Sequence, residues 1–431
     1  MIDFSKKLIG NKELVDKLIY NFNIDRGYWY DEMYTLFISN PNVSISLFFE
    51  RLRGNFETNF IYDSVPHYYY LILRHFFLIF DYSVENGRIF SIISFIISIF
   101  VIFFISRLFL DKSNSLMASG IISLNPFLLW MANETRIAMF LVLISVINIF
   151  FFLKLITTKK NYLNYLVLIS NFLLLSSYPL TISLIAGQIA FIIYQYLFLK
   201  EKNIKIFIII LISISLWIII NNEYLLFKIT SSQGNFARFY YKFFLSYFFN
   251  TFFGSIYFGA FYIFLIIYFL FKNLRKILTD KLLVFLSISI LTTYLMIIVS
   301  SIFATPIMAP RYIIFVIPLI LIWIVRNIEF LNINHKNLFK FFICMISILN
   351  IIVNYDNKPI KKPPTDEALN LILENNEKNI FISTSSIHYR YYINYFENLK
   401  SIKKKDFNII NENQINENKI SSFAFLCLNN P

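Results

Sequence analysis

Residues 137–156 read IAMFLVLISVINIFFFLKLI, an apolar run whose one charged side chain is Lys154. A helix rises about 1.5 Å per residue, so a run of this length is about 30 Å long and matches the hydrocarbon core of a bilayer. The polar sequence NETR at 133–136 stands directly before the run, and Lys159 and Lys160 follow it. The stretch therefore predicts a membrane-spanning helix with polar ends.

Similar runs recur through the middle of the chain. Of all residues, 57% are hydrophobic and 15% are charged, whereas soluble domains carry about 25% charged residues. The runs expected to span the membrane are 90–110, 114–131, 137–156, 161–178, 180–199, 204–220, 252–271, 282–303, 312–326 and 338–353. We therefore expect an all-α polytopic membrane protein with about ten transmembrane helices and additional interfacial helices.

The net charge of +13 first suggests a nucleic-acid partner, but its distribution follows the loops. One set of alternate loops holds Arg107, Lys112, Lys154, Lys159, Lys160, Lys200, Lys202, Lys205, Lys272, Arg275, Lys276, Lys281, Arg326, Lys336 and Lys340. The other set holds only Arg136, Lys228, Arg238, Lys242 and Arg311. Positive loops stay in the cytoplasm, so the second set faces outside and nucleic acid is excluded as a partner.

This topology predicts three parts. Residues 1–89 form an extracytoplasmic segment, in which 66–80 (PHYYYLILRHFFLIF) is too short to span and suits an interfacial helix. Residues 90–353 form the transmembrane domain. Residues 354–431 form a small extracytoplasmic α/β tail, with a helix over 365–375 and strands at 380–383 and 423–428.

Residues 1–28 contain neither a spanning run nor the apolar core of a signal peptide, although the topology places them outside. Moving an 89-residue segment that contains polar residues across a membrane is physically difficult without a preceding hydrophobic span. We therefore expect a further helix upstream of this sequence.

Two adjacent carboxylates, Asp31 and Glu32, follow the aromatic residues 28–30 (YWY) ahead of the first span. An acidic turn beside an interfacial aromatic belt explains the pattern. A carboxylate at this place also suits a general base that accepts a proton from an acceptor hydroxyl or amine. Because successive residues project in different directions, one carboxylate can face a substrate while the other orients a neighbour.

Three further groups lie on the same predicted side of the membrane. Asp63 and His67 flank Pro66, where Asp63 also fits a helix cap. Glu134 and Arg136 share the turn before residue 137, where membrane anchoring is the simpler role. Arg311 and Tyr312 stand at the outer end of a span, where an arginine either reaches the lipid headgroups or clamps a phosphate. Cys344 and Cys427 have no disulfide or metal-ligand spacing.

The order of five short motifs resembles a known family. They are WYDEMYTL (29–36), DSVPHYYYL (63–71), ENGRIFS (85–91), NPFLLWMANETR (125–136) and PRYIIFVIP (310–318). Together they resemble the GT-C glycosyltransferases of the protein O-mannosyltransferase and aminoarabinose-transferase type, glycosyltransferase family 39 and its relatives. The sequence VPH at 65–67 departs from the His-Pro-Pro that this family usually carries.

The resemblance implies a cell-membrane hexosyl- or pentosyltransferase that takes a sugar from a polyprenyl-phosphate donor, outside the cytoplasmic membrane, with inversion. The acceptor is a protein, a lipid or a glycan. Asp31 is then the general base and Glu32 its catalytic neighbour. A divalent cation at these two residues stays open, and no metal ligands are assigned. The substrate-binding residues implied are Asp63, His67, Glu134, Arg136, Arg311 and Tyr312.

Two alternatives stay open. A multi-pass transporter also has many spans, but intramembrane charges mark its path, whereas the acidic residues here gather in outer loops. A polymerase or ligase of lipid-linked glycans acts on similar donors. It does not explain the Asp-Glu pair ahead of the spans.

Overall fold

The computed structural model describes residues 30–52, 66–201, 203–222, 249–303 and 310–356, and the backbone of three short strands nearer the C-terminus. The chain divides into two compact units. The first combines Met1–Ser91, Asn133–Arg136 and Lys358–Pro431, and the second combines Ile92–Ala132 and Ile137–Asn357. Helix α6 (Val84–Arg107) begins in the first unit and continues into the second.

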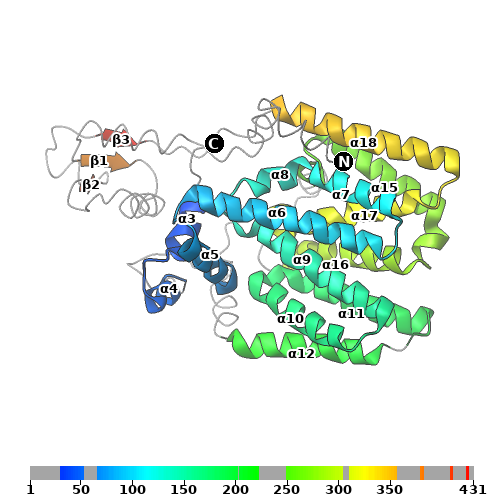
Figure 1. Cartoon of the computed structure of the whole chain (residues 1–431), viewed down its shortest axis with the longest axis horizontal. Coiled ribbons are helices and arrows are strands. Elements are labelled where there is room, and N and C mark those ends of the chain that lie inside the picture. Colours follow the sequence, from blue (N-terminus) through cyan, green and yellow to red (C-terminus); the bar gives the residue numbers. More distant parts are fainter. Residues whose placement is uncertain are drawn as a thin grey trace, which may run out of the picture. The chain divides into compact units, whose positions relative to one another are not determined.

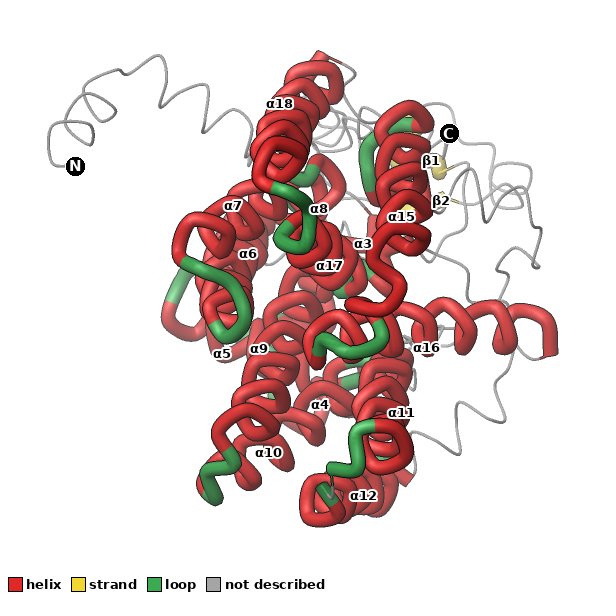
Figure 2. The backbone as a smooth tube through the Cα atoms, turned by 90° about the vertical axis from the view of Figure 1, so that its right-hand side faces the viewer, coloured by secondary structure: helices red, strands yellow, loops and turns green. Residues whose placement is uncertain are grey.

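The described part of the second unit is helical throughout (Figure 1). Figure 2 shows its helices as tubes joined mostly by short loops. Within it, α10 packs against both α9 and α12, and α11 packs along α16. Besides the rest of α6, its elements are α7 (Lys112–Ser123), α8 (Pro126–Ala132), α9 (Ile137–Thr158), α10 (Tyr162–Ser177), η1 (Pro179–Thr181), α11 (Ile182–Phe198), α12 (Ile204–Ile220), α14 (Phe249–Phe252), α15 (Ile256–Ile277), α16 (Lys281–Phe303), η3 (Pro310–Ile313), α17 (Val316–Ile328) and α18 (Ile333–Asp356).

Each apolar run that the sequence predicts as a span is helical. Among the described residues, six helices are long and apolar enough to cross a membrane, and α7 with α8 makes a seventh candidate that is bent by 62°. The other three predicted spans correspond to the shorter apolar helices α10, α12 and α17. These helices confirm the predicted all-α polytopic fold.

The bend between α7 and α8 has a local cause. Pro126 starts α8, and the side chain of Asn125 accepts a hydrogen bond from the N–H of Leu128 at 3.0 Å, as a helix cap does. The same amide donates to the carbonyl of Phe252 at 2.8 Å. One helix therefore ends and another begins here, with the new helix tied to α14.

Helix α17 forms the interior of the second unit. Every one of its residues except Arg326 is buried, and it contacts α7, α15, α16 and α18. A helix that is apolar on all sides belongs in a core rather than at a surface. Pro318 lies in its first turn, where the missing N–H leaves no hydrogen bond unmade.

A chain of amides links three helices of this unit. Gln188 of α11 donates to Asn148 of α9 at 2.6 Å, and Asn148 donates to Asn171 of α10 at 2.7 Å and to Ser170 at 3.0 Å. All four side chains are buried. In an apolar surrounding such hydrogen bonds hold helices together where hydrophobic contrast cannot.

The first unit contains the helices that precede the spans. They are α3 (Tyr30–Ser39), α4 (Ile45–Leu52), α5 (His67–Ile79) and the first two turns of α6. The interfacial segment expected over 66–80 is helical as α5. It buries Tyr69, Tyr70 and Leu73 and exposes Leu78 and Ile79 at its end.

The C-terminal part of the first unit contains a parallel sheet. β1 (Asn379–Ile382) lies between β2 (Asn408–Ile410) and β3 (Ala424–Leu426). The two strands expected at 380–383 and 423–428 are confirmed as β1 and β3, whereas β2 was not predicted. The helix expected over 365–375 lies outside the described residues, and the three-part domain division stays a prediction.

Gly187 of α11 allows α11 and α16 to approach closely, because an added Cβ would lie 2.9 Å from the Cα of Ser289. We expect Gly187→Ala to lower the free energy of unfolding by about 1–3 kcal/mol through overpacking. Gly120→Ala is the control, since nothing lies within 4 Å of its added Cβ in α7. It should be neutral or stabilising by up to about 1 kcal/mol. Denaturation of the purified protein in detergent measures both, and equal changes would contradict the prediction.

Candidate functional site

Helix α3 carries Asp31 and Glu32 in its first turn. The N-terminus of a helix bears a partial positive charge, which stabilises carboxylates there. Successive side chains of a helix point about 100° apart, so the two carboxylates face different surroundings. Glu32 is fully buried, whereas the side chain of Asp31 is 18% exposed.

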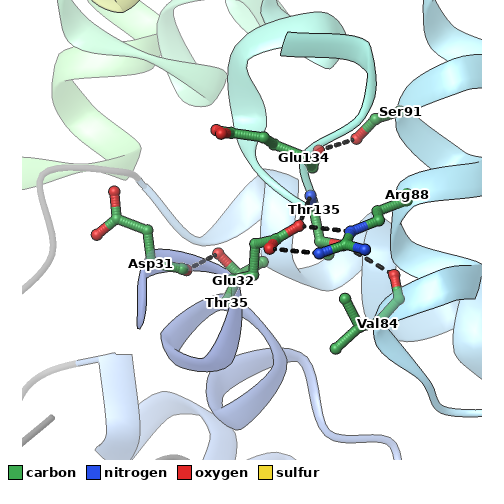
Figure 3. Close-up of polar contacts among 8 residues, drawn as sticks. All are labelled: Asp31, Glu32, Thr35, Val84, Arg88, Ser91, Glu134 and Thr135. Carbon is green, nitrogen blue, oxygen red and sulfur yellow. Dashed lines mark hydrogen bonds and ion pairs between the residues drawn. The ribbon is translucent and has the colours of Figure 1, made fainter. Parts of the chain in front are cut away.

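Glu32 forms a bidentate ion pair with Arg88 of α6 (Figure 3). The Nε of Arg88 donates to Oε1 and its Nη2 donates to Oε2, each at 2.9 Å. The backbone N–H of Thr135 also donates to Oε1 at 2.9 Å. Both charged side chains are 0% exposed. Removing either one would leave the other as an uncompensated buried charge and would strongly lower the free energy of unfolding.

The turn at residues 133–136 is fastened to the beginning of α6. The hydroxyl of Thr135 donates to the carbonyl of Val84 at 2.9 Å, and that of Ser91 donates to the carbonyl of Glu134 at 2.6 Å. A Cβ added to Gly87 would lie 2.2 Å from Cγ2 of Thr135. Glycine is therefore required at position 87 for the turn to reach Glu32.

Asp31 contacts Arg136 of the same turn. The Nη2 of Arg136 lies 3.6 Å from Oδ2 of Asp31. Its Nη1 donates to the hydroxyl of Thr35 at 3.1 Å and to the carbonyl of Asp31 at 3.3 Å, and Thr35 in turn donates to that carbonyl at 2.9 Å. Arg136 thus holds both the backbone and the carboxylate of Asp31.

Figure 3 shows the carboxylates of Asp31 and Glu134 directed away from the Glu32–Arg88 pair. Glu134 is 7% exposed. Asp31 is more exposed than Glu134 and lies beside the guanidinium of Arg136. Glu32 is buried and binds the guanidinium of Arg88 and the backbone N–H of Thr135.

The described residues contain no group of three or more His, Cys, Asp or Glu side chains able to hold a metal ion. Both oxygens of Glu32 are engaged by Arg88, and one of them also accepts from the N–H of Thr135. A divalent cation bound jointly by Asp31 and Glu32 therefore does not fit this arrangement.

The other predicted substrate-binding residues are placed differently. His67 begins α5 and makes a tilted ring contact with Tyr68, with ring centroids 4.5 Å apart, and burial lowers the pKa of His67. Arg311 and Tyr312 lie in η3 of the second unit, where the guanidinium is 5.5 Å from the tyrosine ring centroid. Tyr312 also contacts the ring of Tyr178. Asp63 lies outside the described residues.

Sequence reasoning assigned no role to Arg88, Thr35, Ser91 or Thr135. Arg88 had a usable signal, because an ionisable residue at the start of an apolar run requires a partner. The identity of that partner, 56 positions earlier, depends on tertiary structure. The predicted groups Asp31, Glu32, Glu134 and Arg136 do come together in the first unit.

Comparison with known proteins confirms the resemblance to the GT-C glycosyltransferases. Residues 64–220 match the model of a family described as dolichyl-phosphate-mannose-protein mannosyltransferase. A search of the curated proteins found no match. Among solved structures, the chain is similar to ArnT from Cupriavidus metallidurans bound to undecaprenyl phosphate, with 12% identity and a TM-score of 0.52. ArnT in the apo state gives 13% identity and a TM-score of 0.50.

These alignments cover 74% of this chain and span 60% and 59% of the two ArnT chains. At such identities the likeness shows the fold alone. The chain has the fold of a GT-C membrane glycosyltransferase.

The buried pair gives a test of the site's construction. We expect Arg88→Met to lower the free energy of unfolding by about 3–5 kcal/mol, because Glu32 would stay buried without its cation. Lys281→Met is the matched control: its ion pair with Glu201 is 2.6 Å long, but the side chains are 41% and 30% exposed. That change should cost less than about 1 kcal/mol. Unfolding in denaturant compares the two, and an Arg88 variant as stable as the control would contradict the assignment.

Proposed function

We propose that this chain, whose fold is that of the GT-C glycosyltransferases, transfers a sugar from a polyprenyl-phosphate-linked donor to a protein, lipid or glycan acceptor. The observation that carries the proposal is the separation of the two adjacent acids. Glu32 forms a buried ion pair with Arg88, while Asp31 is part-exposed at the N-terminus of α3 beside Arg136. The undecaprenyl phosphate bound to ArnT supports a polyprenyl-phosphate donor.

In the proposed reaction Asp31 is the general base. Its carboxylate accepts the proton of the acceptor hydroxyl or amine while the acceptor atom forms a bond to the anomeric carbon. The bond from that carbon to the phosphate oxygen breaks on the opposite face, so the configuration inverts. The electron pair leaves with the polyprenyl phosphate, whose growing charge requires cations nearby.

The remaining predicted residues have supporting roles in this proposal. Arg311 clamps the donor phosphate, since a guanidinium matches phosphate oxygens in a bidentate manner. Arg136 holds Asp31 and borders the substrate. Asp63, His67, Glu134 and Tyr312 complete the substrate-binding set. Glu32 acts through the position of its neighbours rather than by touching the reacting atoms.

The active site is proposed to face the extracytoplasmic side. Loop charges place residues 1–89, 133–136 and 354–431 outside, together with the loops that hold Lys228, Arg238, Lys242 and Arg311. The first three of these segments also recur together in the first compact unit, Met1–Ser91, Asn133–Arg136 and Lys358–Pro431. The positive-inside rule and the composition of the first unit therefore agree for these three segments. This agreement supports the proposed side, because segments that fold together must lie on one side of the membrane.

Asp31→Asn tests the general base. We expect turnover by the variant to fall by about 10²- to 10⁴-fold with an unchanged protein level, the usual range for a lost acid–base group. Asp111→Asn is the control, because Asp111 caps the start of α7 by accepting from the N–H of Asn114 at 2.8 Å and asparagine caps equally well. The assay follows release of polyprenyl phosphate in proteoliposomes.

Wild-type turnover by Asp31→Asn would remove Asp31 as the base. Solute movement without any lipid-phosphate donor would instead identify a transporter. Extension of a lipid-linked glycan would identify a polymerase or ligase.

Arg311→Gln tests the phosphate clamp. Loss of a charge-assisted hydrogen bond worth about 1.5–3 kcal/mol should raise the donor KM by about tenfold to 100-fold. The KM for the acceptor should change little. Arg275→Gln, at an exposed position in the last turn of α15, is the control. Equal donor KM values for the two variants would exclude a phosphate contact at Arg311.

A further inference from the structure

The C-terminal end of α3 is held by side chains from three other segments of the first unit. The last four carbonyls of a helix have no partner within it and need one elsewhere. The hydroxyl of Tyr82 donates to the carbonyl of Leu36 at 3.0 Å, and Nη1 of Arg51 donates to that of Phe37 at 2.5 Å. Both carbonyls belong to the last turn of α3.

Arg74 of α5 extends this capping into the connection between α3 and α4. Its Nη1 donates to the carbonyl of Asn40, and its Nη2 donates to those of Pro41 at 3.1 Å and Val43 at 2.5 Å. One guanidinium therefore binds three carbonyls of one short connection. A guanidinium offers five donors in a fixed fork, whereas an ammonium is a point charge on a flexible stem.

Both arginines are buried, Arg51 at 6% and Arg74 at 9% exposure. The guanidinium of Arg51 also lies 3.9 Å from the ring centroid of Phe37. Cations near the C-terminus of a helix interact favourably with its dipole, as carboxylates do at the N-terminus. Helix α3 carries both, with Asp31 and Glu32 at one end and the two arginines at the other.

We propose that Arg74 is a positioning residue that sets the place of the Asp31 carboxylate by fixing the far end of α3. The inference rests on the proposed function, in which Asp31 is the base. Helix α3 has ten residues and is about 15 Å long, short enough to move as a rigid rod. Glu32 restrains its N-terminal end and the arginines its C-terminal end, so a change at Arg74 shifts Asp31 against Arg136.

The first experiment separates turnover from binding. Arg74→Gln should lower kcat by about 10²-fold, the cost of a misplacement of about 1 Å, with little change in the donor KM. The kcat of Arg74→Lys should lie between that of Arg74→Gln and that of wild type, since an ammonium reaches fewer of the three carbonyls. Arg74→Lys also serves as the measurable variant if Arg74→Gln does not fold. Rates are expressed per folded protein, with thermal unfolding recorded for each.

Arg107→Gln is the matched control. Arg107 donates to the carbonyl of Leu110 at 2.9 Å beyond the end of α6, so it caps a helix end by the same chemistry, far along the chain from Asp31. Its kcat should stay within about twofold of wild type. An Arg74→Gln variant that matches Arg107→Gln in kcat, or loses activity only in proportion to its folded fraction, would overturn the inference.

A second experiment tests whether Arg74 acts through Asp31. Asp31→Glu keeps a carboxylate but displaces it by one methylene. In that background the correct placement is already lost, so Arg74→Gln should reduce kcat by far less than it does in wild type. Equal fold-losses in the two backgrounds would overturn the positioning role.

Failure of the inference is distinguishable from failure of the proposed function. If Asp31→Asn is inactive while Arg74→Gln keeps its kcat, only the positioning role falls. If Asp31→Asn keeps wild-type activity, or wild-type protein releases no polyprenyl phosphate, the proposed function falls and the inference falls with it.

Discussion

The buried ion pair between Glu32 and Arg88 is the constraint around which the first unit is arranged. Removing two charges from water is costly, and the attraction between them offsets that cost only with good geometry and additional hydrogen bonds. The bidentate contact and the amide of Thr135 provide both. The pair therefore determines where α3, α6 and the turn at 133–136 lie with respect to one another. The turn approaches α6 so closely that a Cβ at position 87 would overlap the side chain of Thr135.

The same pair separates the roles of two neighbouring acids. Once Glu32 points inward, the rotation of the helix turns Asp31 toward a less buried environment, where Arg136 and Thr35 hold it. An Asp-Glu motif in a helical first turn is thus not a pair of equivalent carboxylates. Asp31 is part-exposed beside Arg136, whereas Glu32 is fully buried against Arg88. Glu32 is buried against Arg88 and the N–H of Thr135, and the catalytic role predicted for it stays a prediction.

Much of this arrangement follows from sequence patterns, and the rest depends on tertiary contacts. The apolar runs predict the helices of the second unit, because span length and hydrophobicity are local properties. Strands β1 and β3 could also be predicted, because their apolar residues form local patterns. Other features depend on residues that are distant in sequence. These are the partner of Arg88, the carbonyls bound by Arg74 and the pairing of β1 with β2. Loop charge placed Asp31, Glu134 and Arg136 on one side of the membrane, and they share one unit, but their catalytic and binding roles stay predictions.

Helix α17 bears on how the protein is made. At thirteen residues it is about 20 Å long, which is shorter than the hydrocarbon core of about 30 Å. It is buried against α7, α15, α16 and α18. A segment of this kind gains little from lipid and most from its neighbours. Of those neighbours, α7, α15 and α16 are synthesised before it and α18 after it. Its stable insertion is therefore expected to depend on contacts with the three neighbouring helices that precede it in the chain.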